Sequence, residues 1–449
     1  MQFDKSVDWI KSNPDVSSIR AAVVDLNGVW RGKRLPRNQA EKTLVDGIRM
    51  PLSISVEDIW GEDVADNPMV FEAGDLDGFA RPTGRGVLPT DWLSNPTALV
   101  PLWMWQEDGS PSPVDPRQVL ARVLDRYTEK GLTPVTALEL EFYLIGQSDK
   151  RPSKPISPLT ARRLDGDAIM SLDMMDHFEG FFADLYSACA AHDIKVDAAI
   201  SEGGAGQFEV NLLHSNDALK TADDATFFKR FVKGIARKHD FAASFMAKPY
   251  LEQAGSGLHL HFSVLDKDGN NVFNNGTEEG APIMLHAING LMEGMVETSL
   301  IFAPHLNSYR RLAPASHAPT GICWGYENRT AAIRIPGGPP EARRIEHRVA
   351  GADANPYLVI AAVLGAALEG IEMAKAPIDP IEGDAYSADL PQLPDHWAKA
   401  IKAFETGDMP PRIFPPLMHE VYSLMKWQEF NGFTSRMSEF EVATYLEVV

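Results

Sequence analysis

The sequence predicts a protein of mixed α and β structure with a small N-terminal domain and a larger second domain. Its 449 residues are more than one ordinary hydrophobic core usually holds. Hydrophobic residues make up 44% of the chain and charged residues 23%, as in globular proteins with ample core material. Prolines at positions 111, 113 and 116 interrupt the pattern, and strand-like and helix-like segments alternate after them. We therefore expect domains at 1–110 and 111–449.

The N-terminal region combines an amphipathic helix, expected at 3–12, with several short strands. Asn27 and Gly28 stand between two strand-like runs, which is typical of a two-residue hairpin in which both turn residues take positive φ. Repeated Gly, Pro and Asp at 61–89 predict turns between short strands. A further strand is expected at 97–106.

The second domain is expected to open with a helix at 119–131. The later strands are predicted at 135–145, 195–200, 207–213, 258–265, 331–335 and 343–349. The later helices are predicted at 176–191, 225–238, 283–299, 356–373 and in the closing third of the chain.

The charge and cysteine content exclude several classes of protein. Lys and Arg number 42 against 62 Asp and Glu, a net charge of −20, which suits neither nucleic acid nor an anionic membrane surface as a partner. Two cysteines are too few for a disulfide scaffold. The first residues lack a positive region followed by an apolar run, and the longest apolar stretch, 357–368, is too short to span a bilayer. We expect a cytoplasmic protein whose easiest partner is a basic small molecule.

Two carboxylates lie two residues apart in a run of strand-forming residues. The period of a strand places Glu139 and Glu141 on one face. The apolar residues around them indicate a mostly buried strand, where adjacent carboxylates repel unless a cation lies between them. A divalent metal would resolve that conflict; a wet strand face with solvated glutamates is the alternative.

Two glycine-containing segments repeat this logic. Glu202 and Glu209 stand at the two ends of a glycine-rich bend, which allows close backbone approach to a ligand and suits an oxygen-ligand clip. His259 and His261 share a strand face after a Gly-Ser-Gly bend, and they are either metal ligands or structural histidines.

A third strand places Arg344, Glu346 and Arg348 on one face, as a phosphate or carboxylate site or as a structural ion-pair ladder. Five carboxylates with two divalent cations would leave a nearly neutral cluster. Guanidinium groups match phosphate and carboxylate geometry, and the candidates are Arg311, Arg329, Arg334, Arg344 and Arg348. The chain has no GxxxxGK[ST] loop and no GxGxxG fingerprint, so a phosphate site would be of this metal-and-arginine kind.

Six motifs follow one another in a distinctive order: LELEFYL, SEGGAGQFE, KPYLEQAGSGLHLHFS, NSYRRLAP, ENRTAAIRIPGG and EARRIEHRVAGADANPYL. Together they resemble the glutamine synthetase superfamily over 135–371, and the hairpin ending in RGKRLP resembles it more loosely. The resemblance implies an α+β fold with a small β-grasp-like N-terminal domain and a large catalytic domain whose curved antiparallel sheet forms a funnel-shaped site. It also implies a homo-oligomeric double ring, a dodecamer, in which a neighbour's N-terminal domain completes each site.

The resemblance also assigns roles residue by residue. It makes Glu141, Glu202 and Glu209 ligands of one divalent metal and Glu139, His259 and Glu346 ligands of the other. The positions matching the glutamate site are Gly255, Arg311 and Arg348; those facing phosphate are Arg329, Arg334 and Arg344; those on the nucleotide side are His261, Ser263, Arg334 and Arg344. It implies two Mg²⁺ or Mn²⁺ ions per site and ATP as co-substrate.

The implied reaction converts the γ-carboxyl of L-glutamate to an acyl phosphate, which an amine then attacks. Metals and arginines lower the repulsion between the two anions that must meet. Enzymes of the family that use ammonia carry a glutamate in the flap after the SYRRLAP-like motif, and the matching residue here is His317. Ala254 and Glu341 also depart from the family pattern.

The stretch at 50–64 resembles the γ-glutamylpolyamine synthetase branch, in which the acceptor is a primary amine such as putrescine. His317 is either the base that accepts the amine proton or a spacer in the flap. An acidic partner for a distal ammonium could come from Glu57, Asp58, Glu62 and Asp63, or these could be an ordinary solvated loop. Tyr386 lies in a loop that some relatives modify with a nucleotide.

Four functions remain open at this stage. The first is a glutamate–polyamine ligase. The second is a ligase for methylamine, ethanolamine or another alkylamine, the third is a glutamine synthetase that uses ammonia, and the fourth is a non-catalytic ring protein of the same family. Loss of metal ligands would mark the last, yet all six matching positions are filled.

Overall fold

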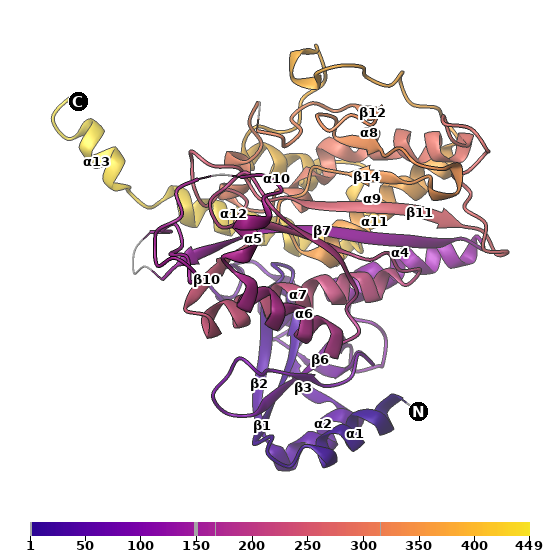
Figure 1. Cartoon of the computed structure of the whole chain (residues 1–449). Helices are drawn as coiled ribbons and strands as arrows, with labels where there is room; N and C mark the ends of the chain where they lie inside the picture. The colour runs from indigo at the N-terminus through magenta and orange to yellow at the C-terminus, as the bar shows by residue number, and fades with distance from the viewer. Residues whose placement is uncertain (1, 148–150, 167, 315) are drawn as a thin grey trace.

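Two β-sheets of different size form the framework of the molecule, and helices cover them (Figure 1). This computed structural model describes residues 2–147, 151–166, 168–314 and 316–449. The smaller sheet has six strands in the order β2-β1-β6-β4-β3, with β5 paired to β6. The larger has eight strands in the order β12-β13-β14-β11-β7-β9-β8, with β10 paired to β7. The predicted α+β class is confirmed.

The smaller sheet and its helices use the first 105 residues. Its strands are β1 (Ser18–Val24), β2 (Trp30–Pro36), β3 (Ile48–Pro51), β4 (Asp77–Pro82), β5 (Leu88–Pro89) and β6 (Thr97–Trp105). Its helices are α1 (Gln2–Ser12), α2 (Ala40–Asp46) and α3 (Pro68–Phe71). The predicted helix at 3–12 and strand at 97–106 are therefore confirmed within one residue. Strand β1 pairs antiparallel with β2 and parallel with β6.

The turn between β1 and β2 differs from the predicted two-residue hairpin. The amide of Gly28 donates to the carbonyl of Asp25 at 2.9 Å, and the amide of Asp25 donates to the carbonyl of Val29 at 2.9 Å. Only Gly28 has a positive φ, 76°, while Asn27 does not. This is the three-residue loop in which a type I turn is followed by a left-handed glycine. The prediction of positive φ at Asn27 was wrong because the Asn-Gly pair also suits this longer loop.

The larger sheet is built from widely separated segments. Its strands are β7 (Thr133–Gly146), β8 (Val196–Ser201), β9 (Gln207–Leu212), β10 (Phe241–Ser244), β11 (Leu258–Leu265), β12 (Trp324–Tyr326), β13 (Ile333–Ile335) and β14 (Ile345–His347). All neighbouring strands are antiparallel except β12 and β13, which are parallel. Strands β13 and β14 are shorter than predicted: β13 begins two residues later, and β14 lacks two residues at each end.

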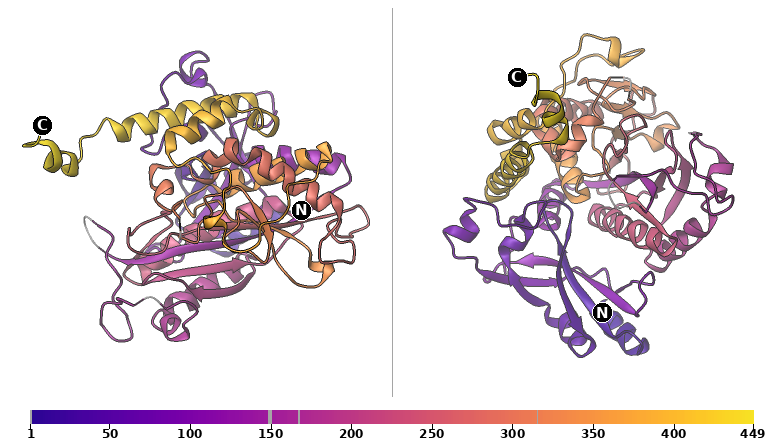
Figure 2. Two further views of the ribbon diagram at one scale, coloured as in Figure 1. Left: turned by 90° about the horizontal axis from the view of Figure 1, so that it is seen from above. Right: turned by 90° about the vertical axis from the view of Figure 1, so that its left-hand side faces the viewer.

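Helices cover the larger sheet and extend beyond it. They are α4 (Pro116–Glu129), α5 (Leu172–Asp176), α6 (Glu179–Ala191), α7 (Ala218–Lys238), α8 (Pro282–Phe302), α9 (Pro356–Met373), α10 (Trp397–Thr406), α11 (Pro410–Ile413), α12 (Pro416–Thr434) and α13 (Glu439–Tyr445). Helix α7 begins seven residues before the prediction because Asp217 caps it and accepts from the amide of Lys220. The turned view shows α12 running on to α13, which projects away from the body (Figure 2).

Two hydrophobic cores divide the structure unequally. One face of the smaller sheet has its own core, which includes Ile19, Val23 and Met104. Its other face, with Val24 and Leu99, shares the core of the larger sheet. The division at residue 110 therefore stays a prediction, because the two sheets have one packed core in common.

Polar contacts fix the β1–β2 turn to the helical part of the chain. Asn27 Nδ2 donates to Glu429 Oε1 at 2.7 Å, and Lys426 pairs with Glu429 at 2.9 Å with both side chains fully buried. Asn355 Nδ2 donates to the carbonyl of Asp25 at 3.0 Å. A buried ion pair with these hydrogen bonds satisfied orients one element on another.

Helix α9 is long and apolar enough to cross a membrane by composition, with a mean hydropathy of 1.5 over 18 residues. However, 83% of that segment is buried inside the protein. It packs on α8 with glycine against glycine: a Cβ added at Gly290 would lie 2.5 Å from the amide of Gly370. The helix therefore serves as the central core helix of this fold.

Candidate active site

The strand register of the larger sheet collects the predicted ligand residues on one surface. Their facing pairs are Glu139 with His259 and with Asn211, Glu141 with Glu209, and His261 with Glu346. Facing Cβ atoms in an antiparallel pair lie about 4.5–5.5 Å apart, so side chains from four strands meet here. The predictions that Glu139 shares a face with Glu141, and His259 with His261, agree with this register.

Glu139 is the centre of the cluster. Its Oε2 lies 3.1 Å from Nδ1 of His259, and its Oε1 lies 2.9 Å from Nε2 of His261. The Oε1 atom of Glu346 lies 3.9 Å from His259 Nδ1 and 4.0 Å from His261 Nε2.

Two sets of three side chains have ligand atoms within 4.8 Å of one another. One is Glu139, His261 and Glu346, and the other is Glu139, Glu209 and His259. The grouping differs from the one that the resemblance implies: His261 joins the first set, Glu209 joins Glu139 and His259 in the second, and Glu141 and Glu202 belong to neither.

Burial and the proximity of like charges shift the pKa values of the carboxylates in this cluster. Burial, with the charges of Glu139 and Glu141, raises the pKa of Glu209 to about 9. Burial and the charge of Glu141 raise the pKa of Glu202 to about 7. For Glu139, hydrogen bonds from the two histidines outweigh burial and hold its pKa well below the ordinary value. Near neutral pH, Glu209 therefore retains its proton and Glu202 titrates, unless cations stabilise the two carboxylates.

Two uncharged side chains next to the carboxylates also suit a site for divalent cations. The side-chain oxygens Gln207 Oε1 and Asn211 Oδ1 are buried and have no hydrogen-bond partner among the described residues. Both residues lie on β9 beside the carboxylates, and their amide nitrogens contact Glu141 and Glu139. Carboxylate, amide and imidazole ligands together suit Mg²⁺ or Mn²⁺.

Arginines surround the cluster at the β13–β14 side. Arg334 Nη1 and Arg348 Nη1 each donate to Glu346 at 2.8 Å, and Glu346 is 1% exposed. Arg344 Nε donates to Nδ1 of His261 at 3.3 Å. The charges of His261, Arg348 and His259 overcome burial and lower the pKa of Glu346.

The predicted glutamate-binding residues lie at the other side of Glu141. A Cβ added at Gly255 would lie 2.8 Å from Arg311 Cγ, and the Gly257 amide donates to Glu141 at 3.0 Å. Arg311 is 4% exposed and donates from Nη1 to the carbonyl of Val349 at 2.8 Å. Gly255 and Arg311 are therefore in contact, and the carbonyl of Val349 ties Arg311 to the residue after Arg348.

The predicted nucleotide side opens into a cavity of about 1060 Å³. Glu139, His261, Ser263, Glu341 and Arg344 line it. The cavity therefore joins four of the predicted nucleotide-side and metal residues to one open space, with Glu341 at its edge where the family usually has a basic residue.

Three other predicted residues stand apart from the close cluster. Arg329 is exposed, although its charge acts on Glu202. His317 is exposed and has a positive φ of 61°, which is uncommon outside glycine. Tyr386 donates to the carbonyl of Ala318 at 2.8 Å, so it contacts the segment that carries His317; Ala315 of that segment lies outside the described residues.

The N-terminal carboxylates have structural contacts of their own. Asp58 is 2% exposed and accepts from the amides of Trp60 and Glu62 and from Gln428. Glu57 pairs with Arg31 at 2.9 Å. In the described parts of the chain, no hydrogen bond or ion pair joins Glu57, Asp58, Glu62 or Asp63 to the Glu139 cluster. Within one chain these acids therefore do not complete the site.

Sequence reasoning missed three groups. Gln207 and Asn211 could have been predicted from the sequence, because each lies two residues from Glu209 on the same strand and therefore shares its face. Glu327, whose Oε1 accepts from Arg334 at 3.3 Å, stands two residues before Arg329. The third is a cluster of cations on α7, considered below, whose spacing along a helix is visible in the sequence.

The fold and this cluster define a glutamine synthetase-type catalytic domain. The family model described as "Glutamine synthetase, catalytic domain" matches residues 113–445. The chain therefore belongs to the glutamine synthetase family.

Relatives and solved structures agree with this membership. The gamma-glutamylputrescine synthetase PuuA of Escherichia coli (strain K12) is 34% identical, over 98% of this chain and 93% of its own length. A glutamate–isopropylamine ligase of a Pseudomonas species is 33% identical, over 100% and 98%. A GmaS/ADP complex superposes with a TM-score of 0.84 at 28% identity, covering 98% of this chain and 99% of that one.

Proposed function

We propose that this protein is an ATP-dependent ligase that joins the γ-carboxyl of L-glutamate to an organic amine, with a polyamine such as putrescine as the first candidate. The observation that carries the proposal is the convergence of Glu139, Glu209, His259, His261 and Glu346 in two overlapping ligand sets beside the 1060 Å³ cavity. Four strands supply these residues, and a non-catalytic ring would not need them.

The proposed metal ligands are Glu141, Glu202 and Glu209 for one divalent cation and Glu139, His259 and Glu346 for the other. Two features support this assignment. The pKa values of Glu202 and Glu209 are raised, and the side-chain oxygens of Gln207 and Asn211 have no hydrogen-bond partner among the described residues. His261 shares Glu139 with His259, so it is the seventh side chain of the same centre. Two divalent ions supply charge neutralisation and polarise phosphoryl oxygens.

The chain's own residues then have distinct tasks. Arg311 and Arg348 bind the carboxylates of glutamate, and the Gly255 backbone leaves room for them. Arg329, Arg334 and Arg344 answer the negative charge of the phosphoryl group as it passes from ATP to the γ-carboxylate. His261 and Ser263 hold the nucleotide in the cavity. The amine attacks the acyl carbonyl, phosphate leaves, and one proton must be removed from the amine.

His317 is the proposed acceptor of that proton. It is exposed, in the place where ammonia-using relatives carry a flap glutamate, and imidazole can accept a proton near neutral pH. Replacing His317 with Ala tests this role by the amine-dependent rate across pH. A pH profile and rate equal to those of the unchanged protein would leave His317 as a spacer in the flap.

The acceptor is tested by phosphate release from ATP and glutamate with ammonia, methylamine, ethanolamine, putrescine, cadaverine and spermidine in turn. We expect the highest catalytic efficiency with a diamine or polyamine. The isopropylamine relative makes an alkylamine the second candidate. Highest efficiency with ammonia would overturn both in favour of glutamine synthesis.

We also propose that subunits form a double ring in which a neighbour's N-terminal region completes each site. One observation supports an assembly: α13 carries exposed Phe440 and Tyr445 away from the body (Figure 1). Mass photometry measures the subunit number, and a monomer with full activity would contradict the shared site. A cytoplasmic location belongs to the same proposal.

A further inference from the structure

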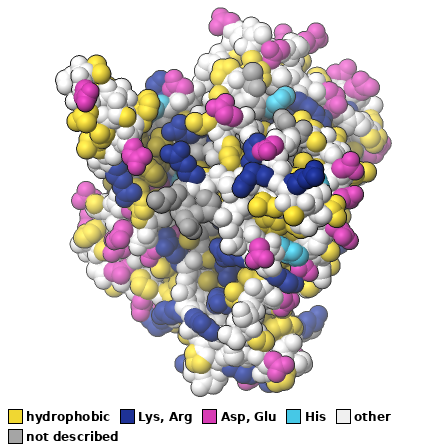
Figure 3. All heavy atoms as spheres, turned by 60° about the vertical axis from the view of Figure 1, so that its left-hand side comes forward, with side chains coloured by type: hydrophobic (Ala, Val, Ile, Leu, Met, Phe, Trp, Pro, Cys, Tyr) yellow, Lys and Arg dark blue, Asp and Glu magenta, His cyan; other side chains and the backbone are white. Residues whose placement is uncertain are grey.

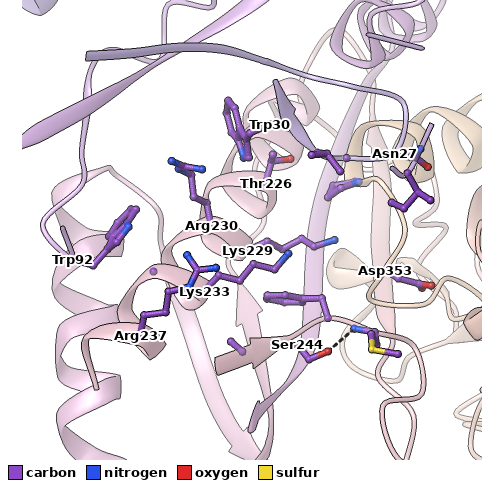
Figure 4. A pocket seen from close by; sticks show the side chains of 18 of the residues that line it. Asn27, Trp30, Trp92, Thr226, Lys229, Arg230, Lys233, Arg237, Ser244 and Asp353 are labelled. Carbon is purple, nitrogen blue, oxygen red and sulfur yellow. Dashed lines mark hydrogen bonds between the residues drawn. The ribbon is translucent and has the colours of Figure 1, made fainter. Parts of the chain in front are cut away.

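A second cavity, of about 680 Å³, lies between the smaller sheet and α7. Figure 4 shows Lys229, Arg230, Lys233 and Arg237 extending from one helix into this space, with Trp30 and Trp92 beside them and Asp353 across it. Arg20 of β1 adds a fifth cation. The volume is in the range of small-molecule sites. None of the metal or phosphate residues proposed above lines this cavity.

The five cations have no carboxylate partner among the described residues, unlike the other cations of α7. Lys220 pairs with Asp224 at 2.7 Å, and Lys238 pairs with Asp184 at 2.8 Å. In contrast, Arg230 Nε is buried without any hydrogen-bond partner among the described residues. In a chain of net charge −20, a gathering of uncompensated cations is a local reversal of the overall charge.

The remaining polar contacts of these cations go to neutral groups. Lys229 Nζ donates to the carbonyl oxygens of Ala352 at 2.8 Å and Ala354 at 3.1 Å. Arg20 contacts the hydroxyl of Thr97. Asp353 is the one acid among the described lining residues, and it accepts from the Ser308 hydroxyl at 2.6 Å. One carboxylate against five cations leaves a clear excess of positive charge.

The pKa values of these groups reflect that excess. Burial and then Lys233 lower the pKa of Lys229 to about 7. Burial, Arg20 and Arg237 lower the pKa of Arg230. Positive charge nearby therefore adds to burial in disfavouring the charged forms of Lys229 and Arg230, and a bound anion would relieve both.

Two tryptophans give the cavity aromatic walls, each packed on a phenylalanine of α7. Trp30 stacks on Phe227 with ring centroids 5.9 Å apart, and Trp92 lies 5.7 Å from Phe231. Gly234 is what allows Trp92 to approach the helix, since a Cβ there would lie 2.4 Å from the indole ring. Rigid aromatic walls with a few convergent charges are typical of ligand sites.

We propose that this cavity is a binding site for a small organic anion that carries at least two negative charges, as phosphate or carboxylate groups. The fit rests on the five basic side chains without a carboxylate partner among the described residues, the single opposing carboxylate and the two tryptophans of the wall. Guanidinium forks bind either kind of oxyanion in the same bidentate way, so the shared chemistry is a polyvalent oxyanion.

The test is calorimetric titration of the metal-free full-length protein, dialysed free of chelator so that no other polyanion competes. The probes are pyrophosphate, citrate and, as a monovalent comparison, acetate. We expect saturable binding of pyrophosphate or citrate and none of acetate. Tighter binding of pyrophosphate than of citrate would indicate a phosphate ligand, and the reverse order would indicate a carboxylate ligand.

A double variant, Lys233→Gln with Arg237→Gln, is expected to weaken that binding by about tenfold or more, because two charge-assisted contacts are lost. Both side chains are exposed at the mouth, so the variant should fold. Lys220→Gln with Lys238→Gln is the matched control: it removes two positive charges from the same helix, outside the cavity, and should change affinity by less than about twofold. Absence of saturable binding, equal affinity in the double variant, or an equal loss in the control would each overturn the proposal.

Discussion

The Glu139 cluster and the α7 cavity both concentrate charge of one sign, and they manage it differently. In the cluster, His259, His261 and two arginines stand among the carboxylates at 2.8–3.1 Å. In the cavity, the described cations find only carbonyl and hydroxyl oxygens and one acid. The space-filling view, with basic side chains in groups between acidic ones, shows that both signs share one face (Figure 3).

Because of this difference, we expect the two regions to respond differently to ligand binding and to substitution. Histidines and arginines partly neutralise the carboxylates of the cluster, so these contacts hold its geometry before any metal binds. Removing one member therefore breaks several contacts at once. The cavity is held by aromatic packing rather than by its charges. We therefore expect Lys233 and Arg237 to be dispensable for folding, whereas loss of a charged member of the cluster should destabilise the protein.

The largest expected effect is in the cluster, from Glu346→Gln. This side chain accepts from Arg334 and Arg348 and belongs to one ligand set, so its neutralisation should lower the amine-dependent rate by about 100-fold or more. Phosphate release with Mg²⁺, glutamate and putrescine measures it. Glu405→Gln, an exposed carboxylate paired only with Lys402, is the control and should keep the full rate. A fully active Glu346→Gln protein would remove the residue from the centre.

Metal addition should separate the two regions next. At Mg²⁺ or Mn²⁺ concentrations about 100 times Kd, binding to the folded state adds roughly 2.7 kcal/mol to the free energy of unfolding. Thermal melts with and without metal measure this, and Glu209→Gln should abolish the gain. The Lys233→Gln and Arg237→Gln variant should keep it. Equal melting temperatures with and without metal would contradict a cation site at the cluster.

Gly234→Ala is expected to have a smaller effect, confined to the cavity. The new Cβ would meet the Trp92 ring at 2.4 Å, and overpacking costs about 1–3 kcal/mol, partly offset by the roughly 1 kcal/mol that Ala gains in a helix. Denaturant unfolding compares it with Gly294→Ala, whose Cβ meets the flexible Met409 at 2.9 Å. We expect Gly234→Ala to be the less stable of the two and to bind the anion more weakly. The reverse order would mean that Trp92 does not close the cavity.

In the metal-free protein, the two regions are expected to show opposite dependences of stability on pH. The pKa of Glu209 is raised from 4.5 to about 9, so its contribution is present below pH 4.5 and is lost as pH rises through 9. The pKa of Lys229 is lowered from 10.5 to about 7, so the unfolded chain binds that proton more tightly and stability rises between pH 7 and 10.5.

Denaturant midpoints across this range measure both slopes. Glu209→Gln should reduce the fall and leave the rise, and Lys229→Met should reduce the rise and leave the fall; Glu202, whose pKa is raised to about 7, keeps part of the fall. A variant whose slope matches that of the unchanged protein would contradict the burial assigned to the residue it replaces.

Much of the fold could be predicted because its signals are local. Strand β11 and helix α9 begin and end as predicted, since alternation and an uninterrupted apolar run are properties of a few consecutive residues. The type of the β1–β2 turn and the start of α7 depended on alternatives and caps that a pattern leaves open. The parallel pairing of β12 with β13 has no local signal at all.

The sequence by itself determined which side chains share a strand face, such as Glu139 with Glu141, because alternation follows from the backbone. Only the tertiary structure decided that Glu139 sits between His259 and His261, since strand partners are chosen by packing between distant segments. Packing between distant segments also forms the α7 cavity: Arg20 and Lys233 line one space only because the smaller sheet packs near that helix.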